Sequence, residues 1–141
     1  MAGNGAAPQK VFRIGMLGFG TVGAGAAKLI LESVPPLKDK TGIDLRIHKV
    51  CVRDLKKPRL VSLPKDAFTT DPQQIVNDPQ VDIVVEVLGG LEPAKALVLQ
   101  ALKNGKSVVT ANKALLATHG KELFETALAT HTSIGFEASV C

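Results

Sequence analysis

An apolar run over residues 11–17 leads directly into a G-x-G-x-x-G turn, and this pairing constrains the fold more than any other stretch of the chain. In such turns the first glycine allows a tight exit from a strand, the second lets the backbone approach a pyrophosphate, and the third lets the next helix pack closely on the sheet. The free N–H groups and the positive end of the helix dipole then face the anion. We therefore predict a phosphate-binding turn made of Gly18, Phe19, Gly20, Thr21, Val22 and Gly23.

A chain with 13 glycines can contain this spacing by chance, so the surrounding pattern decides whether the turn binds a phosphate. A helix of small residues is predicted from residue 22 to about Ser33, where Pro35 and Pro36 should end it, and residues 37–42 follow as a polar loop. Predicted strands then cover residues 43–52, 67–70, 81–87, 106–110 and 133–140. The helices between them are predicted to begin at Asp71, Pro93 and Asn112.

This alternation predicts an α/β fold of the Rossmann type, a doubly wound and mainly parallel sheet with helices on both faces. A chain of 141 residues has room for one domain, which we place at residues 10–141. Residues 1–9 are small, polar and glycine-rich, and we predict that they form a disordered tail.

The composition excludes several classes of function. The net charge of +4 is modest and its cations are spread without aromatic residues between them, which argues against nucleic-acid binding. No apolar stretch reaches the length of a membrane span, and the two cysteines do not indicate a disulfide framework. We expect a cytoplasmic protein whose ligands are anionic small molecules. The three histidines show no metal-ligand spacing and are assigned surface or capping roles.

Ligands of such sheets bind beyond the carboxyl ends of the strands. Four segments should therefore lie together there: residues 18–23, 53–54, 86–90 and 110–113. Arg53 stands where these domains usually carry an acid for the ribose 2′-hydroxyl, and Lys57 follows closely, so that NADP is favoured over NAD. Asp54 keeps NAD open, and the alternative is a basic loop that only faces solvent.

Three further polar residues stand at predicted strand ends. Lys113 is placed to give or take a proton beside a nicotinamide, although a lysine at a helix start is often merely solvated. Asn112 is either close to the cofactor or only a helix N-cap. Glu86 is too polar for a sheet core without a partner, which indicates either a structural hydrogen bond or a cofactor contact.

These residues together resemble the N-terminal cofactor-binding half of homoserine dehydrogenase. The resemblance rests on LGFGTVG at residues 17–23, VRD at 52–54, VVEVLGG at 84–90, VTANKALLA at 109–117 and FEASV at 136–140. It extends from about Lys10 to the last residue. The glycine motif is common to many dehydrogenases, whereas the TANK and EASV segments in this order are far more specific.

The resemblance implies NAD(P)-dependent interconversion of L-homoserine and L-aspartate 4-semialdehyde, a step in the biosynthesis of threonine, methionine and isoleucine. The resemblance also implies that Lys113 is one of two catalytic lysines and that Arg53 binds the 2′-phosphate of NADP. Thr110 and Asn112 would lie near the nicotinamide, and Gly89, like Glu86, would be a cofactor-binding residue. It also implies a monovalent cation, with Glu137 and the Val140 carbonyl as its ligands.

Family members continue into a substrate and dimerisation domain, whereas this chain stops at Cys141. We therefore expect a cofactor domain that does not turn over homoserine alone, and a homo-oligomer for the full-length protein. Two alternatives stay open: a stand-alone nucleotide-sensing module without catalysis, and another semialdehyde-type dehydrogenase of the same fold.

Overall fold

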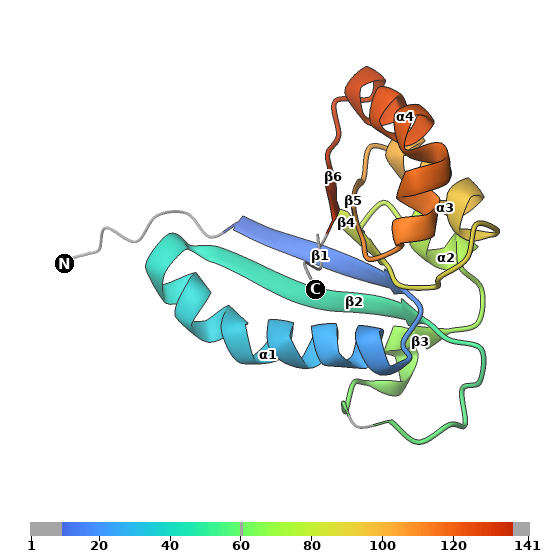
Figure 1. Ribbon diagram of the computed structural model, residues 1–141. Coiled ribbons are helices and arrows are strands. Elements are labelled where there is room, and N and C mark those ends of the chain that lie inside the picture. Colours follow the sequence, from blue (N-terminus) through green and yellow to red (C-terminus); the bar gives the residue numbers. More distant parts are fainter. Residues whose placement is uncertain (1–9, 60, 137–141) are drawn as a thin grey trace.

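Six parallel strands form one sheet in the computed structural model, which describes residues 10–59 and 61–136 (Figure 1). In chain order the strands are β1 (Lys10–Leu17), β2 (Ile43–Cys51), β3 (Phe68–Thr69), β4 (Ile83–Glu86), β5 (Ser107–Thr110) and β6 (Ile134–Phe136). Across the sheet they lie in the order β3-β2-β1-β4-β5-β6. Starting from β1, the chain adds β2 and β3 on one side and then β4, β5 and β6 on the other. This confirms the predicted Rossmann-type fold.

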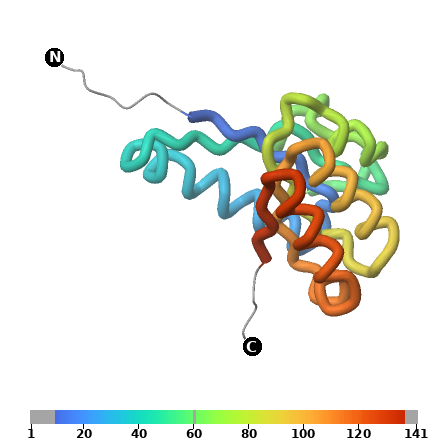
Figure 2. Tube along the Cα trace, turned by 90° about the horizontal axis from the view of Figure 1, so that it is seen from above, coloured from blue at the N-terminus to red at the C-terminus, as the bar shows by residue number. Residues whose placement is uncertain are grey.

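The helices divide between the two faces of the sheet. Helix α1 (Thr21–Thr41) runs beside β1 and β2 on one face, while α2 (Gln73–Val76), α3 (Ala94–Lys103) and α4 (Lys113–Ala129) gather on the other (Figures 1 and 2). Each face has its own hydrophobic cluster. One cluster joins α1 to the sheet through Ala27, Met16 and Val50. The larger cluster joins α2, α3 and α4 to the sheet, with Leu17 and Val84 at its centre. This division follows from right-handed crossovers that run in opposite directions from β1.

Helix α1 does not end before its prolines, and the predicted stop near Ser33 is wrong. The helix continues through Pro35 and Pro36 to Thr41, so that the predicted loop over residues 37–42 is mostly helical. Both prolines are exposed, whereas Val34 and Leu37 are half-buried and continue the apolar stripe begun by earlier residues of the helix. Water can satisfy the carbonyls left without donors on the exposed side. The real stop is Gly42, which has a φ of 74° and donates its N–H to the Lys38 carbonyl.

This arrangement predicts that Pro36→Ala stabilises the protein. A proline inside a helix costs about 3 kcal/mol relative to alanine, and part of that cost is offset here by the stiffer unfolded chain. We expect the free energy of unfolding to rise by about 1–2 kcal/mol, measured by urea denaturation. Pro72→Ala is the matched control, because Pro72 stands at the start of α2, where proline is tolerated. An unchanged or lower stability of Pro36→Ala would contradict the prediction.

The remaining elements differ from the predictions mainly at their ends. Strand β4 is shorter than the predicted 81–87, and β6 is described only as far as Phe136. The Asp71 carboxylate accepts a hydrogen bond from the Gln73 N–H at 2.9 Å, as expected at a helix start. The sequence also predicts an apolar stripe of Leu123, Phe124, Ala127 and Leu128 on α4, but Phe124 and Leu128 are 40% and 76% exposed. No helix in the described ranges is long and apolar enough to cross a membrane.

Candidate cofactor site

The four predicted segments lie side by side at the carboxyl edge of the sheet, because the strands that precede them are neighbours and parallel. The turn after β1 is tied to the strands on both sides. The Gly18 N–H donates to the Cys51 carbonyl at 3.1 Å, and the Val87 N–H donates to the Leu17 carbonyl at 2.9 Å. The centre of this edge is therefore the switch point between β1 and β4, where ligands of doubly wound sheets bind.

The glycines of the turn meet three different demands. Gly18 has a φ of 101°, which favours glycine. A Cβ at Gly23 would lie 2.8 Å from the Gly18 carbonyl oxygen, so Gly23 allows the turn and helix to approach each other. A Cβ at Gly20 would meet no protein atom within 4 Å. The glycine at position 20 is thus not required for packing, and the open space fits the approach of a ligand.

The N-terminus of α1 fits an anion. Gly20 is the N-cap and supplies no side chain, and the first turn of the helix contains no acidic residue. The first N–H groups of a helix have no partner within it, so these donors are available to a phosphate group. Thr21 and Val22 are exposed beside them. The Phe19 side chain points away into the core, where its ring lies 5.9 Å from that of Phe68, so that only its backbone faces the turn.

Arg53 and Lys57 lie on the exposed loop after β2. The Asp54 carboxylate turns back to accept the Lys56 N–H at 2.8 Å, which folds the loop tightly at that point. Lys57 lines a pocket of about 520 Å³ together with Arg59, Lys65 and Phe68. The structure thus gathers basic side chains at the end of β2, as the sequence predicts, and adds a cavity that the sequence does not reveal.

Glu86, at the end of β4, is completely buried. One carboxylate oxygen accepts the Thr110 hydroxyl at 2.5 Å, and the other accepts the Leu88 N–H at 2.8 Å and the Gly89 N–H at 3.4 Å. The sequence leaves Glu86 either a structural hydrogen bond or a cofactor contact, and the contacts observed here are structural hydrogen bonds. Glu86 fixes the loop after β4, in which Gly89 has a φ of 77°.

Thr110 and Asn112 extend this network to the start of α4. The Thr110 hydroxyl accepts the Asn112 N–H at 3.0 Å. Asn112 is the N-cap of α4, since its side-chain oxygen accepts the Leu115 N–H at 3.0 Å, and its amide nitrogen donates to the Gly90 carbonyl at 2.6 Å. Lys113 is the first residue of α4 and is exposed. The loops after β4 and β5 are therefore one bonded unit, with Lys113 at its surface.

The shifted pKa values belong to Lys106 and Asp78, which precede β5 and β4, and to Cys51, the last residue of β2. Burial lowers the pKa of Lys106, against the opposing effect of Asp78 and Asp82. Burial alone would raise the pKa of Asp78, but hydrogen bonds from Gln80 and His48 outweigh it and hold that pKa below its usual range. Burial, and next the negative charge of Asp71, raises the pKa of the Cys51 thiol, which stays protonated as a small apolar group. These groups serve the packing of the sheet.

The predicted cation ligands, Glu137 and Val140, lie outside the described residues. Within residues 10–59 and 61–136 no three His, Cys, Asp or Glu side chains come close enough to hold a metal ion.

Comparison with known proteins agrees with this geometry. Residues 18–137 match the protein family described as "Homoserine dehydrogenase, NAD binding domain". Homoserine dehydrogenase of Bacillus subtilis is 46% identical over 132 residues, which are 94% of this chain and 30% of the relative. The crystal structure of the S. aureus homoserine dehydrogenase at pH 8.5 superimposes with a TM-score of 0.87 at 42% identity, covering 94% of this chain and 33% of that one.

A more distant structure carries a cofactor. A hyperthermophilic archaeal homoserine dehydrogenase in complex with NADPH matches with a TM-score of 0.75 at 27% identity, over 93% of this chain and 45% of that chain. The chain spans about 30% of the length of the Bacillus relative. With the family match over residues 18–137 and the glycine turn at the switch point of the sheet, the chain belongs to the homoserine dehydrogenase family, as its NAD-binding domain.

Proposed function

We propose that this chain is the NADP-binding domain of an enzyme that interconverts L-homoserine and L-aspartate 4-semialdehyde. The observation that carries the proposal is the uncapped N-terminus of α1 beside Gly20, in a chain that matches the homoserine dehydrogenase family. The pyrophosphate would lie on the N–H groups of that helix, with the adenosine toward β2 and the nicotinamide toward β4 and β5.

The cofactor supplies or accepts the hydride when it is bound. The residues of this chain position it and handle the proton. In aldehyde reduction, the Lys113 ammonium group donates a proton to the substrate oxygen, and in the reverse direction the amine takes that proton from the hydroxyl. Glu86, Thr110 and Asn112 hold the loops on which the nicotinamide ring would rest.

The other two thirds of the relatives would supply the substrate domain and the second lysine. We therefore expect the 141-residue chain to bind the cofactor without oxidising homoserine, and the full-length protein to be a homo-oligomer. Glu137 and Val140 remain proposed ligands of a monovalent cation. Robust homoserine-dependent reduction of NADP by the 141-residue chain would contradict the proposal that catalysis needs the remainder of the protein.

Arg53→Ala tests the cofactor preference. A dianionic 2′-phosphate that loses one charge-assisted hydrogen bond should bind about tenfold more weakly, whereas NADH has no such group and should change less than about twofold. The binding of both is measured through the fluorescence of the reduced nicotinamide, because the chain contains no Trp or Tyr to interfere. Lys28→Ala, on the exposed side of α1, is the control for the loss of one positive charge.

Two outcomes of this titration would contradict the proposal. If NADPH and NADH weaken equally in Arg53→Ala, the residue does not meet the 2′-phosphate. If ATP binds the wild-type chain more tightly than either dinucleotide, the protein is the nucleotide-sensing module instead.

A further inference from the structure

The guanidinium group of Arg59 holds the backbone of the loop that carries the predicted 2′-phosphate residues. One terminal nitrogen donates to the Asp54 carbonyl at 2.6 Å, and the other donates to the Lys57 carbonyl at 2.6 Å. These two carbonyls bracket the loop just after Arg53. A planar fork with two donors can make both bonds at once, which a lysine ammonium cannot do in the same geometry.

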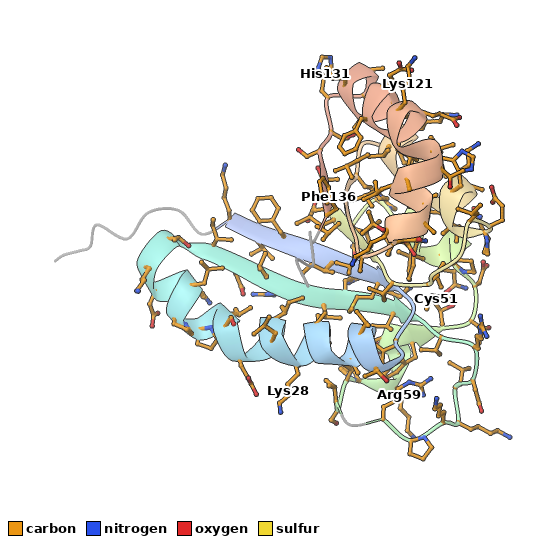
Figure 3. All side chains as sticks on the ribbon, in the orientation of Figure 1. Lys28, Cys51, Arg59, Lys121, His131 and Phe136 are labelled. Carbon is orange, nitrogen blue, oxygen red and sulfur yellow. The ribbon has the colours of Figure 1, made fainter. Side chains whose placement is uncertain are left out.

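Arg59 also contacts one aromatic ring, and a second ring packs against the first. Its Cζ atom lies 5.2 Å from the centroid of the Phe68 ring, within the range of a cation–π contact. The Phe68 ring in turn meets the Phe19 ring edge to face, with centroids 5.9 Å apart and an angle of 74° between the planes. Phe19 belongs to the glycine turn, so this stack connects the basic loop to the phosphate-binding turn (Figure 3 shows Arg59 near the N-terminal end of α1).

Two of the three nitrogens of Arg59 make hydrogen bonds to the protein. The two terminal ones bind the loop, and Nε is buried without a hydrogen-bond partner in the described residues. Arg53 and Lys57, by contrast, are exposed. Together with Lys56, the loop therefore has three exposed cations, whereas Arg59 holds its backbone.

We propose that Arg59 is a positioning residue that sets the preference for the phosphorylated dinucleotide, by keeping Arg53 and Lys57 in place before the cofactor arrives. The inference rests on the proposed cofactor function. Ordering a loop during binding weakens the contacts that this loop makes, and a loop that is already ordered avoids this loss. Only the 2′-phosphate depends on these cations, so the effect of Arg59 should fall on NADPH and not on NADH.

The test measures NADPH and NADH affinity by nicotinamide fluorescence in the full chain carrying Arg59→Ala or Arg59→Lys. We expect both variants to bind NADPH about tenfold more weakly and NADH within about twofold of wild type, since neither keeps the fork. Hydrogen–deuterium exchange should rise in residues 53–58 of both variants and stay unchanged in β1 and β4. Adding Arg59→Ala to the Arg53→Ala, Lys57→Ala double variant should not change the NADPH to NADH ratio further.

Several results would overturn this role. If Arg59→Lys binds NADPH as tightly as wild type does, the positive charge of residue 59 is sufficient and the fork is not needed. If Arg59→Ala lowers the ratio of NADPH to NADH affinity as much in the double variant as in the wild-type background, Arg59 acts by its own charge on the phosphate. If Arg59→Ala weakens the binding of NADPH and NADH equally, the substitution has damaged the fold in general. The Arg59→Lys variant then decides whether the fork is needed. Failure of the wild-type chain to bind either dinucleotide would overturn the cofactor function itself, and this inference with it.

Discussion

Gly20→Ala is expected to weaken NADPH binding by about 100-fold or more while leaving the melting temperature unchanged or slightly higher. Gly20 has a φ of −75°, which alanine adopts easily, and an added Cβ would touch no protein atom within 4 Å. The methyl group would instead occupy the space through which a pyrophosphate reaches the first N–H groups of α1. The substitution of Gly20 should therefore weaken NADPH binding without lowering the stability of the fold.

Two other glycines of the same segment provide matched controls for Gly20→Ala. Gly25→Ala also meets no atom within 4 Å but lies inside α1, so it should leave NADPH binding within about twofold and raise the melting temperature slightly. Gly23→Ala would place its Cβ 2.8 Å from the Gly18 carbonyl and should lower both stability and binding. Fluorescence titration and thermal unfolding of the three variants check the pattern. Wild-type affinity in Gly20→Ala would show that the phosphates lie elsewhere.

Glu86→Ala is expected to lower the free energy of unfolding by about 4 kcal/mol, a large part of the total stability of a small domain. The carboxylate is fully buried and accepts hydrogen bonds from the Thr110 hydroxyl and the Leu88 N–H. Removing it leaves these donors without a partner and creates a cavity between β4 and β5. The melting temperature should fall by about 10 °C or more.

Glu86→Gln separates the loss of hydrogen bonds from the loss of volume. Its amide oxygen can still accept the backbone N–H groups, but its NH₂ group cannot accept the Thr110 hydroxyl, so about half of the loss is expected. Glu125→Ala, on the exposed side of α4, should change stability by less than about 0.5 kcal/mol. Urea denaturation measures all three, and a Glu86→Ala variant as stable as Glu125→Ala would refute the structural role of the network.

The sequence pattern predicted the sheet because its signals are local. The glycine turn, the apolar strands and the helix start at Asp71 each depend on a few neighbouring residues, and the alternation then restricts the topology to few choices. The positions of Arg53, Glu86 and Asn112 at one edge follow from that topology, since parallel strands end together. The assignment to the homoserine dehydrogenase family came from short motifs, and the match over residues 18–137 confirms it.

Features that depend on tertiary contacts were not predictable in the same way. The prolines of α1 indicated a helix end, but the apolar face formed by Val34 and Leu37 outweighed them. Arg59 stands in an irregular loop with no periodicity, and its partners are two backbone carbonyls and the ring of Phe68. The sequence marks Glu86 as too polar for a sheet core, yet only the fold shows that its partner is Thr110, 24 residues away.

The two hydrophobic clusters of the sheet have a consequence for how cofactor use can evolve in this domain. The basic loop and Arg59 rest on Phe68 and Phe19, which belong to the cluster shared with α1. The Glu86 network rests on the cluster shared with α3 and α4. If the cofactor lies as proposed, substitutions near its adenosine end would affect the packing of the first cluster, whereas the loops near the nicotinamide rest on the second. On that placement, a lineage of such proteins would be able to change which dinucleotide it binds without repacking the loops after β4 and β5.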